Sequence, residues 1–323
     1  MPDDADFAAL ADPYRRELLV HCYRMLGSFH DAEDAVQEVY LRAWRGLDGF
    51  EGRSSVRTWL YRIATRVCLT ALEKRERRVL PSGLGGPTED VNTIPLERRP
   101  EVPWLEPFPD RAVFDDPADP AVAVAHRESV RLAFVAALQT LPARQRAALL
   151  LCDVVRLSAR DAATALEMTT AAVNSALQRA RAQLSAERPV EGEVAMTAEE
   201  SRTLAAYISA FEGGDVAALA GLLRQDVALE MPPVPGWFAG RPAVLEFIGG
   251  RVMAPTNRWR LLPVRANGCP AAISYRRGDD GRDHLHGVQV LEMIDGRIAH
   301  LYVFLDALHD ERLLRGFDVP TVL

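Results

Sequence analysis

Two stretches of the sequence decide the fold: residues 170–181, TAAVNSALQRAR, and residues 50–65, FEGRSSVRTWLYRIAT. In the first stretch, Val173, Leu177 and Ala180 recur at helical spacing. The opposite side of this predicted helix carries short polar and guanidinium side chains, which are the groups that read base edges in the major groove. With a helix predicted over 158–167 and a turn before residue 170, the pattern indicates a helix-turn-helix. The alternative is an ordinary three-helix bundle with a polar outer face.

The second stretch predicts a basic helix that carries aromatic side chains. Residues 53–78 hold 8 basic and 2 acidic side chains, between segments 1–52 and 79–126 that each have a net charge of −6. Arginines attract phosphates, and bases of an opened duplex stack on aromatic rings with about 1–3 kcal/mol per base. Trp59 and Tyr61 can supply such stacking, although Trp59 also shares an apolar stripe with Ile63, which favours the core. A solvated charged helix is the alternative for the whole stretch.

The N-terminal part of the chain predicts several helices. Gly27–His30 is a break, after which Asp31 is expected to cap a helix with an apolar stripe through Val36 and Val39. Ser54 or Ser55 is expected to cap the basic helix that follows.

A proline-rich segment follows these helices. Residues 79–126 contain nine of the chain's 21 prolines and lose apolar periodicity, which predicts an extended linker. A simple spacer does not need large aromatic side chains, so Trp104 and Phe108 predict a segment that docks on another part of the protein. The alternative is that they cover the edge of a neighbouring core.

The C-terminal part changes character after a second linker at 187–198. Helices are predicted over 200–212 and 215–224, followed by strands at 227–231, 271–276, 285–294 and 297–305. Asp295-Gly296 between the last two strands is a strong hairpin signal. Strand alternation places His284, His286, Val288 and Val290 on the same face of their strand. It likewise places His300, Tyr302, Phe304 and Asp306 on the same face of theirs.

Composition limits the class of protein. The 323 residues are 48% hydrophobic and 26% charged with a net charge of −7, which is typical of a globular protein and argues against a general DNA-coating protein. The four cysteines are scattered, so neither a disulfide framework nor a structural zinc site is expected, and a cytoplasmic location fits. No membrane partner is expected, because no apolar run approaches ~18 residues.

The quoted motifs together resemble an extracytoplasmic-function (ECF) sigma factor of bacterial RNA polymerase. DAEDAVQE at 31–38 resembles the helix that grips the polymerase β′ clamp, and RTWLYRIA at 57–64 resembles the helix that reads the −10 element. LPARQR at 141–146 and VNSALQRAR at 173–181 resemble the domain that reads the −35 element and meets the β flap. Residues 199–315 look like a SnoaL-like domain, and WLEP at 104–107 resembles the linker motif of a subgroup with such a tail.

The resemblance implies a multidomain fold and a function for each part. Sigma region 2 is all-α over 7–78, the linker covers 79–126, and region 4 is an all-α helix-turn-helix over 127–186. The second linker covers 187–198, and the α+β SnoaL-like domain, a cystatin-like cone, covers 199–315. The chain is then expected to bind core RNA polymerase and promoter DNA and to initiate transcription, with the tail as a regulatory module.

The implied site residues fall into groups. Contacts with the −10 element are assigned to Arg53, Ser54, Ser55, Arg57, Arg62, Arg66, Lys74, Arg75, Arg77 and Arg78. Contacts with the −35 element are assigned to Thr170, Asn174, Ser175, Gln178, Arg179 and Arg181. Polymerase binding is assigned to Asp31, Asp34, Gln37 and Glu38, and docking between domains to Trp104, Leu105, Pro107 and Phe108.

The tail leaves more than one function open. A pocket lined by His284, His286, His300, Tyr302, Phe304 and Asp306 can hold a small-molecule ligand or run acid–base chemistry. No catalytic residue, metal ligand or cofactor is assigned, because no paired acid and base stands out and a shared fold does not imply activity. The alternatives for the whole chain are a helix-turn-helix regulator with a ligand-sensing tail and a SnoaL-like enzyme with a helical adaptor.

Overall fold

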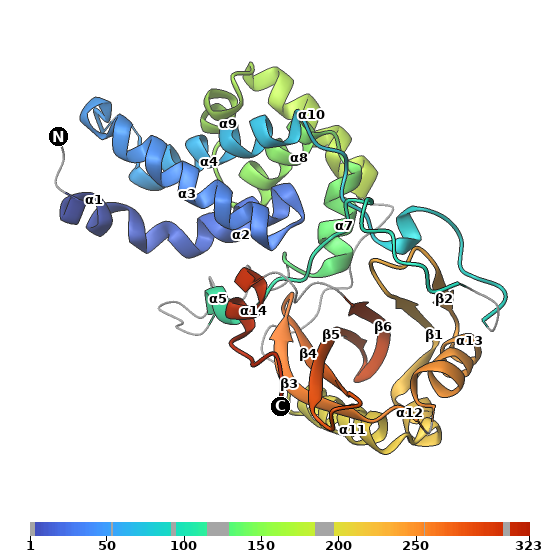
Figure 1. The fold of residues 1–323 in the computed structure, drawn as a ribbon. Coiled ribbons are helices and arrows are strands. Elements are labelled where there is room, and N and C mark those ends of the chain that lie inside the picture. The colour runs from blue at the N-terminus through green and yellow to red at the C-terminus, as the bar shows by residue number, and fades with distance from the viewer. Residues whose placement is uncertain are drawn as a thin grey trace. The chain divides into compact units, whose positions relative to one another are not determined.

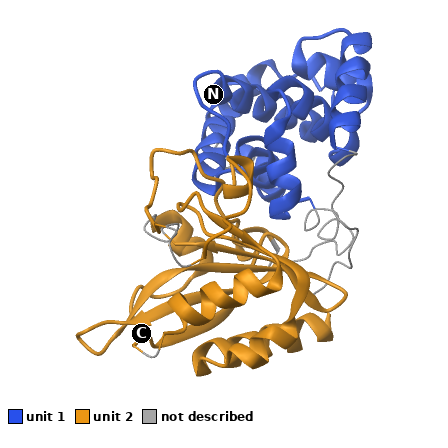
Figure 2. Ribbon diagram, turned by 90° about the vertical axis from the view of Figure 1, so that its right-hand side faces the viewer, with its two compact units in different colours: residues 1–78, 116–189 blue, residues 79–115, 190–323 orange. Residues whose placement is uncertain are grey.

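The computed structural model describes residues 4–52, 54–91, 95–114, 129–184, 197–254, 256–305 and 311–323. The chain divides into two compact units, which are coloured separately in Figure 2. The helical unit comprises residues 1–78 and 116–189, and the mixed unit comprises residues 79–115 and 190–323. Each unit is therefore built from two segments that are separated in the sequence.

The helical unit contains two groups of helices, as the sequence predicts. The N-terminal group is α1 (Asp4–Ala11), α2 (Arg15–Leu26), α3 (Phe29–Gly46) and α4 (Val56–Leu72). The second group is α7 (Leu132–Thr140), α8 (Ala143–Leu149), α9 (Ala159–Leu166) and α10 (Thr170–Leu184). A π-helical turn, Leu150–Val154, extends α8. Figure 1 shows both groups in blue to green.

Serine side chains cap α3 and α4 of this unit. Ser55 caps α4, because its Oγ accepts a hydrogen bond from the backbone N–H of Thr58 at 3.1 Å. The prediction that Asp31 caps α3 is wrong. Ser28 is the cap, and its Oγ accepts from the N–H of Asp31 at 3.0 Å. The helix starts one turn earlier because Ser28 already has extended backbone angles and a hydroxyl in reach of the free N–H groups.

The mixed unit is a six-stranded sheet with helices on one face. In spatial order the strands are β2 (Trp237–Ala239), β1 (Leu223–Glu230), β6 (Arg297–Phe304), β5 (Asp283–Ile294), β4 (Cys269–Arg277) and β3 (Trp259–Ala266). Only β1 and β6 pair in parallel among these strands. Figure 1 shows α11 (Ala198–Gly213) and α12 (Val216–Leu222) along the sheet, with α13 (Arg241–Phe247) near β1. Short helices α5 (Arg111–Phe114) and α14 (Glu311–Phe317) contact each other.

One tight turn and one β-bulge determine where the side chains of the sheet point. Asp295 and Gly296 both have positive φ and join β5 to β6, so the predicted hairpin is confirmed. Tyr275 pairs with Leu285 and Ser274 with Gly287, which leaves His286 as the extra residue of a β-bulge. The prediction that His284 and His286 share a face with Val288 and Val290 is therefore wrong, because the bulge shifts the alternation by one residue.

The core of the mixed unit lies between the sheet and its helices. Tyr207 and Phe211 of α11 and Leu291 and Leu301 of the sheet are buried in it, and Val91 from the proline-rich segment joins them. Since Leu301 faces the helices, its neighbours His300 and Tyr302 lie on the opposite face of the sheet. The sequence missed β2, β3 and α13. The strand β3 contains Pro263, which weakens a strand prediction but is tolerated on an edge strand.

Candidate nucleic-acid interface

The outer face of α10 presents an exposed polar group. Val173, Ala176, Leu177 and Ala180 are buried, while Asn174, Gln178 and Arg179 are exposed on the other side. Arg179 Nη1 donates to Ser175 Oγ at 2.6 Å, which orients the guanidinium along the helix. The side-chain amides of Asn174 and Gln178 form no hydrogen bond within the described part of the chain. Their amides are the groups that pair with adenine in a major groove.

Arg181 has a structural partner instead. Its guanidinium donates to both carboxylate oxygens of Asp153, at 2.8 and 2.6 Å, in the π-helical turn after α8. Thr170, the first residue of α10, is exposed. The predicted −35 group is thus split between an exposed set and an arginine that ties α10 to α8.

The arginines of α4 are largely engaged within the helical unit. Arg57 Nε donates to both oxygens of Glu17 at 3.0 Å, and its Nη1 donates to the carbonyl of Val155 at 3.2 Å. Arg66 donates to the carbonyls of Ala165 and Thr164 and pairs with Glu167 at 2.8 Å. These acceptors lie at the ends of helices, where free carbonyls attract cations. Arg57 and Arg66, two of the predicted −10 arginines, therefore bind the group α7–α10.

The remaining predicted −10 residues divide into three sets. Ser54 is half-buried and Ser55 caps α4, while Arg53 lies outside the described residues. Arg75 and Arg78 both pair with Asp31, the latter through Nη2 and Oδ2 at 2.8 Å. The side chains without a hydrogen bond or ion pair to the described residues are Arg62, Lys74 and Arg77. Trp59 is buried against Phe50, with ring centroids 4.8 Å apart, so its placement in the core is confirmed.

Two buried arginines join the two groups of helices. Arg24 is 0% exposed, its Nε donates to the carbonyl of Ser129 at 3.2 Å, and its own carbonyl accepts from Gln139 at 3.1 Å. Arg146 donates to the carbonyls of Met25, Gln139 and Leu141. Burial lowers the pKa of each arginine to about 10, so both remain cations at neutral pH. The contact is thus polar, although it is closed to water.

A buried histidine lies beside this contact. His21 Nε2 lies 3.0 Å from Thr65 Oγ1, and its ring meets that of Tyr61 edge to face. Burial lowers the pKa of His21 to about 3, and the nearby cations Arg24 and Arg57 add to the effect. The imidazole is therefore neutral at physiological pH.

The exposed face of α3 holds most of the predicted polymerase residues. Asp34 and Gln37 are exposed there, and Glu38 pairs with Arg42 at 2.6 Å. Asp31 instead is buried, and although burial raises its pKa, hydrogen bonds from Arg75 and Arg78 outweigh this and hold the pKa below its usual value. Sequence reasoning missed Leu41, which is 51% exposed one turn after Gln37. Its signal was an apolar residue off the buried stripe of the helix.

The proline-rich segment packs on the mixed unit. Phe108 is 0% exposed, and its backbone N–H donates to Asn267 Oδ1 at 2.9 Å while its carbonyl accepts from the N–H of Asn267. Asp110 accepts from the N–H of Gly268 at 2.8 Å and pairs with Arg265 at 3.3 Å. Three other predicted docking residues, Trp104, Leu105 and Pro107, are also buried. The segment therefore behaves as part of the mixed unit.

Another contact of this segment involves a buried carboxylate. Glu230 is 1% exposed, its Oε2 accepts from the N–H of Ser82 at 2.8 Å, and its Oε1 lies 2.8 Å from His300 Nε2. The ring of His300 stacks on Tyr302 at 3.9 Å, and the Tyr302 hydroxyl donates to Glu292 at 3.3 Å. Burial, with Glu292 and Glu230 nearby, raises the pKa of Tyr302, so the phenol keeps its proton.

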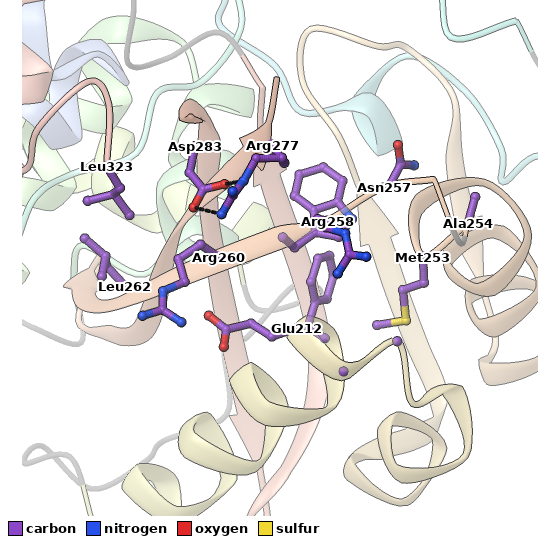
Figure 3. Close-up of a pocket in the computed structure, with 14 residues that line it drawn as sticks. Glu212, Met253, Ala254, Asn257, Arg258, Arg260, Leu262, Arg277, Asp283 and Leu323 are labelled. Atoms are coloured by element: carbon purple, nitrogen blue, oxygen red, sulfur yellow. Dashed lines mark hydrogen bonds and ion pairs between the residues drawn. The ribbon is translucent and has the colours of Figure 1, made fainter. Parts of the chain in front are cut away.

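None of the described residues predicted to line a pocket lines the cavity that the structure shows at the edge of the sheet. His284 pairs with Asp280 at 2.9 Å, His286 packs edge to face on Trp259 at 4.8 Å, and Phe304 is buried. Asp306 lies outside the described residues. A cavity of about 860 Å³, drawn in Figure 3, is lined by other residues, from the end of α11, the loop before β3, β3 itself and the β4–β5 hairpin.

Neither a bilayer-spanning helix nor a metal-binding cluster is found in the described ranges. No helix in them is both long and apolar enough to cross a bilayer. No three or more His, Cys, Asp or Glu side chains in these ranges are arranged to hold a metal ion.

The chain matches three known domain families. They are Sigma-70 region 2 over residues 10–78, Sigma-70 region 4 over 131–184 and the SnoaL-like domain over 204–301.

Known proteins resemble the chain along most of its length. It is 52% identical over 306 residues to the ECF RNA polymerase sigma factor SigG of Mycobacterium tuberculosis, covering 93% of this chain and 81% of that protein. It is 40% identical over 74 residues to SigW, an ECF sigma factor of Bacillus subtilis, covering 23% of this chain and 40% of that one. The fold matches the crystal structure of SigJ from M. tuberculosis with a TM-score of 0.61 and 21% identity, over 98% of this chain and 100% of that one.

Proposed function

The chain belongs to the ECF sigma factors of bacterial RNA polymerase, and from that premise we propose which of its surfaces perform each step of initiation. As a sigma factor, it binds core RNA polymerase, recognises a promoter and starts transcription, and it carries a SnoaL-like tail. Region 2 spans 7–78 and region 4 spans 127–186, with linkers at 79–126 and 187–198 and the tail at 199–315. A protein with this role works in the bacterial cytoplasm, where core polymerase and chromosomal DNA are found.

The exposed polar face of α10 is the observation that carries the proposal. Asn174, Gln178 and Arg179 project from one side of a helix whose other side is buried, so the face is free for a major groove. We assign −35 readout to these three side chains. Arg181 positions the helix through Asp153 and makes no base contact in this proposal.

Reading of the −10 element requires the arginines of α4 to change partners. Arg57 and Arg66 donate to protein carbonyls and carboxylates in this structure, and DNA phosphates present the same kind of oxygen acceptor. Arg62, Lys74 and Arg77 need no such exchange. We assign first contact with DNA to these three and later contact to Arg57 and Arg66.

Core polymerase is proposed to bind the exposed face of α3. Asp34, Gln37 and Leu41 lie at helical spacing and are all exposed, so they share one face that a partner can contact. The β′ clamp is the proposed partner of this face, and the β flap is the proposed partner of region 4.

Run-off transcription with purified core polymerase tests the proposal. Gln178→Ala and Arg179→Ala should each weaken promoter binding by about 1–3 kcal/mol, because each removes a base contact. Arg297→Ala, an exposed arginine of the tail, is the matched control and should leave transcription unchanged. If the wild-type chain gives no promoter-directed transcript with any core enzyme from its own genus, the proposed function is wrong. If both α10 variants match the control, the assigned face is wrong.

A further inference from the structure

The cavity of Figure 3 lies beside the edge strand of the sheet and has a mixed lining. Its lining includes Phe211 and Met253, which are buried, and half-buried Trp259. Trp259 is fixed in place, because its Nε1 donates to the carbonyl of Val252 at 2.9 Å and its ring meets Phe211 edge to face at 5.7 Å. A flat apolar molecule can therefore pack on a preformed aromatic wall without reordering it.

The acidic side chains of the lining are already neutralised or bound. Asp283 accepts from Arg277 through both oxygens, at 2.5 and 3.0 Å, so these two charges cancel. Glu212 Oε1 accepts from the backbone N–H of Leu261 at 2.8 Å, which satisfies part of the exposed edge of β3. Among the acidic side chains of the lining, only the Glu212 carboxylate has no arginine partner, so it alone can balance the charges of Arg258 and Arg260.

Two arginines of the lining have no acidic partner among the described residues. The guanidinium groups of Arg258 and Arg260 form no hydrogen bond or ion pair with the residues that the structure describes, and both residues line the cavity. They lie on either side of Trp259 in the sequence, where the loop enters β3. Guanidinium groups bind carboxylates and phosphates through paired N–H donors, and they do so more strongly where an apolar wall excludes water.

We propose that this cavity binds an anionic small molecule with a flat apolar body, whose acidic group pairs with Arg258 and Arg260 and whose body packs on Trp259, Phe211 and Met253. The site is separate from the His300–Glu230 contact on the other face of the sheet. The proposal does not depend on the chain's role in transcription, because binding is measured directly.

Fluorescence with 1-anilinonaphthalene-8-sulfonate, an anionic aromatic probe, tests the site on the full-length protein. Naphthalene-1-carboxylate and its neutral amide then compete for the probe. The carboxylate should displace it at about tenfold lower concentration than the amide, a difference of about 1.4 kcal/mol. Equal displacement by both competitors would overturn the role of charge.

Variants locate the binding. In Arg258→Gln/Arg260→Gln, the preference for the carboxylate should disappear, while Arg297→Gln, an exposed arginine outside the cavity, should keep it. A melting temperature within a few degrees of the wild type shows that the double variant is folded. If the preference persists in the folded double variant, the anion binds elsewhere and the proposal is wrong. If Arg297→Gln loses it too, the effect is one of general charge, and the proposal is again wrong.

Discussion

Charged side chains of the helical unit are buried where its two groups of helices meet. Arg24 and Arg146 make hydrogen bonds to backbone carbonyls of the other group, and a buried charge is tolerated only with such bonds. Because these bonds have fixed directions, they select one arrangement of the helices. Water can replace the same bonds when the surfaces part, so the contact is specific and still separable.

His21 makes the packing of α2 against α4 sensitive to pH. Its folded pKa of about 3 lies below the ordinary value of 6.5, so the unfolded chain binds the proton more readily. Its contribution to stability is complete above pH 6.5 and is lost as the pH falls towards 3. Between pH 7 and pH 5, the helical unit should lose about 2 kcal/mol of unfolding free energy.

Hydrogen exchange of amides in α2 and α4 at both pH values measures this effect. His21→Gln keeps a polar group near Thr65 and should flatten the dependence, while His284→Gln, an exposed histidine in the mixed unit, should not. Equal protection of the wild type at pH 7 and pH 5 would contradict the prediction.

Single helices separate the residues that form the core from those that are exposed on the surface. Helix α3 buries Ala32, Val36, Val39 and Ala43 on one face and exposes Asp34, Gln37 and Leu41 on the other. The sequence predicted the buried stripe from its spacing. It did not predict that Asp31 would turn inward to Arg75 and Arg78, because those partners come from another element.

The exposed face of α3 should be needed for polymerase and not for folding. Asp34→Arg and Leu41→Ala should each weaken core polymerase binding at least tenfold, while unfolding free energy changes by about 0.5 kcal/mol or less. Asp48→Arg, a charge reversal at an exposed position after α3, is the control. Binding can be measured by fluorescence anisotropy with labelled chain. Normal core binding by both α3 variants would refute the proposed interface.

On the scale of the whole molecule, the compact helical unit is too small to contact the −10 and −35 elements of a promoter at the same time. A unit of roughly 150 residues has a radius of gyration of about 15 Å. Elements centred near −10 and −35 are ~25 base pairs apart, or about 85 Å at ~3.4 Å per base pair. The two groups of helices must therefore separate on promoter DNA, which breaks the contacts of Arg24, Arg57, Arg66 and Arg146.

Energy transfer between dyes measures that separation. Dyes at Asp48→Cys and Ala182→Cys, in a Cys152→Ser background, should transfer strongly in the free chain and weakly in the promoter complex. A pair at Asp48→Cys and Glu73→Cys, both within the N-terminal group, should not change. Strong transfer by the first pair in an active promoter complex would show that the helices stay together.

The linker connects this separation to the tail. As long as the described part of residues 79–114 stays docked on the mixed unit, it cannot extend when regions 2 and 4 separate. We propose that docking limits the distance between regions 2 and 4, and that release of the linker favours initiation.

Weakening the docked linker tests this regulation. Asn267→Ala removes the acceptor of the Phe108 N–H, and loss of such a buried bond costs about 1–3 kcal/mol. Exchange of the Phe108 amide should speed up at least tenfold, and transcription should rise. Gln225→Ala, exposed on β1, should change neither. Faster exchange with unchanged transcription would mean that the tail does not regulate through the linker.

The sequence by itself determined the multidomain fold class, the main helices and the β5–β6 hairpin, and it singled out the polar face of α10. Helices and tight turns depend on residues within a few positions of one another, so spacing and caps are enough to predict them. For the same reason, the spacing around Asn174 and Gln178 singled out a polar helix face before any contact was known, and the resemblance to ECF sigma factors assigned that face to the −35 element.

Only the tertiary structure decided what the charged and aromatic side chains contact. Arg57 meets the carbonyl of Val155, 98 residues away, and Phe108 meets Asn267, 159 residues away. The bulge at His286 and the placement of Arg258 and Arg260 at an edge strand also depend on strand pairing. No local pattern records these contacts, because each depends on which surfaces meet when the chain has folded.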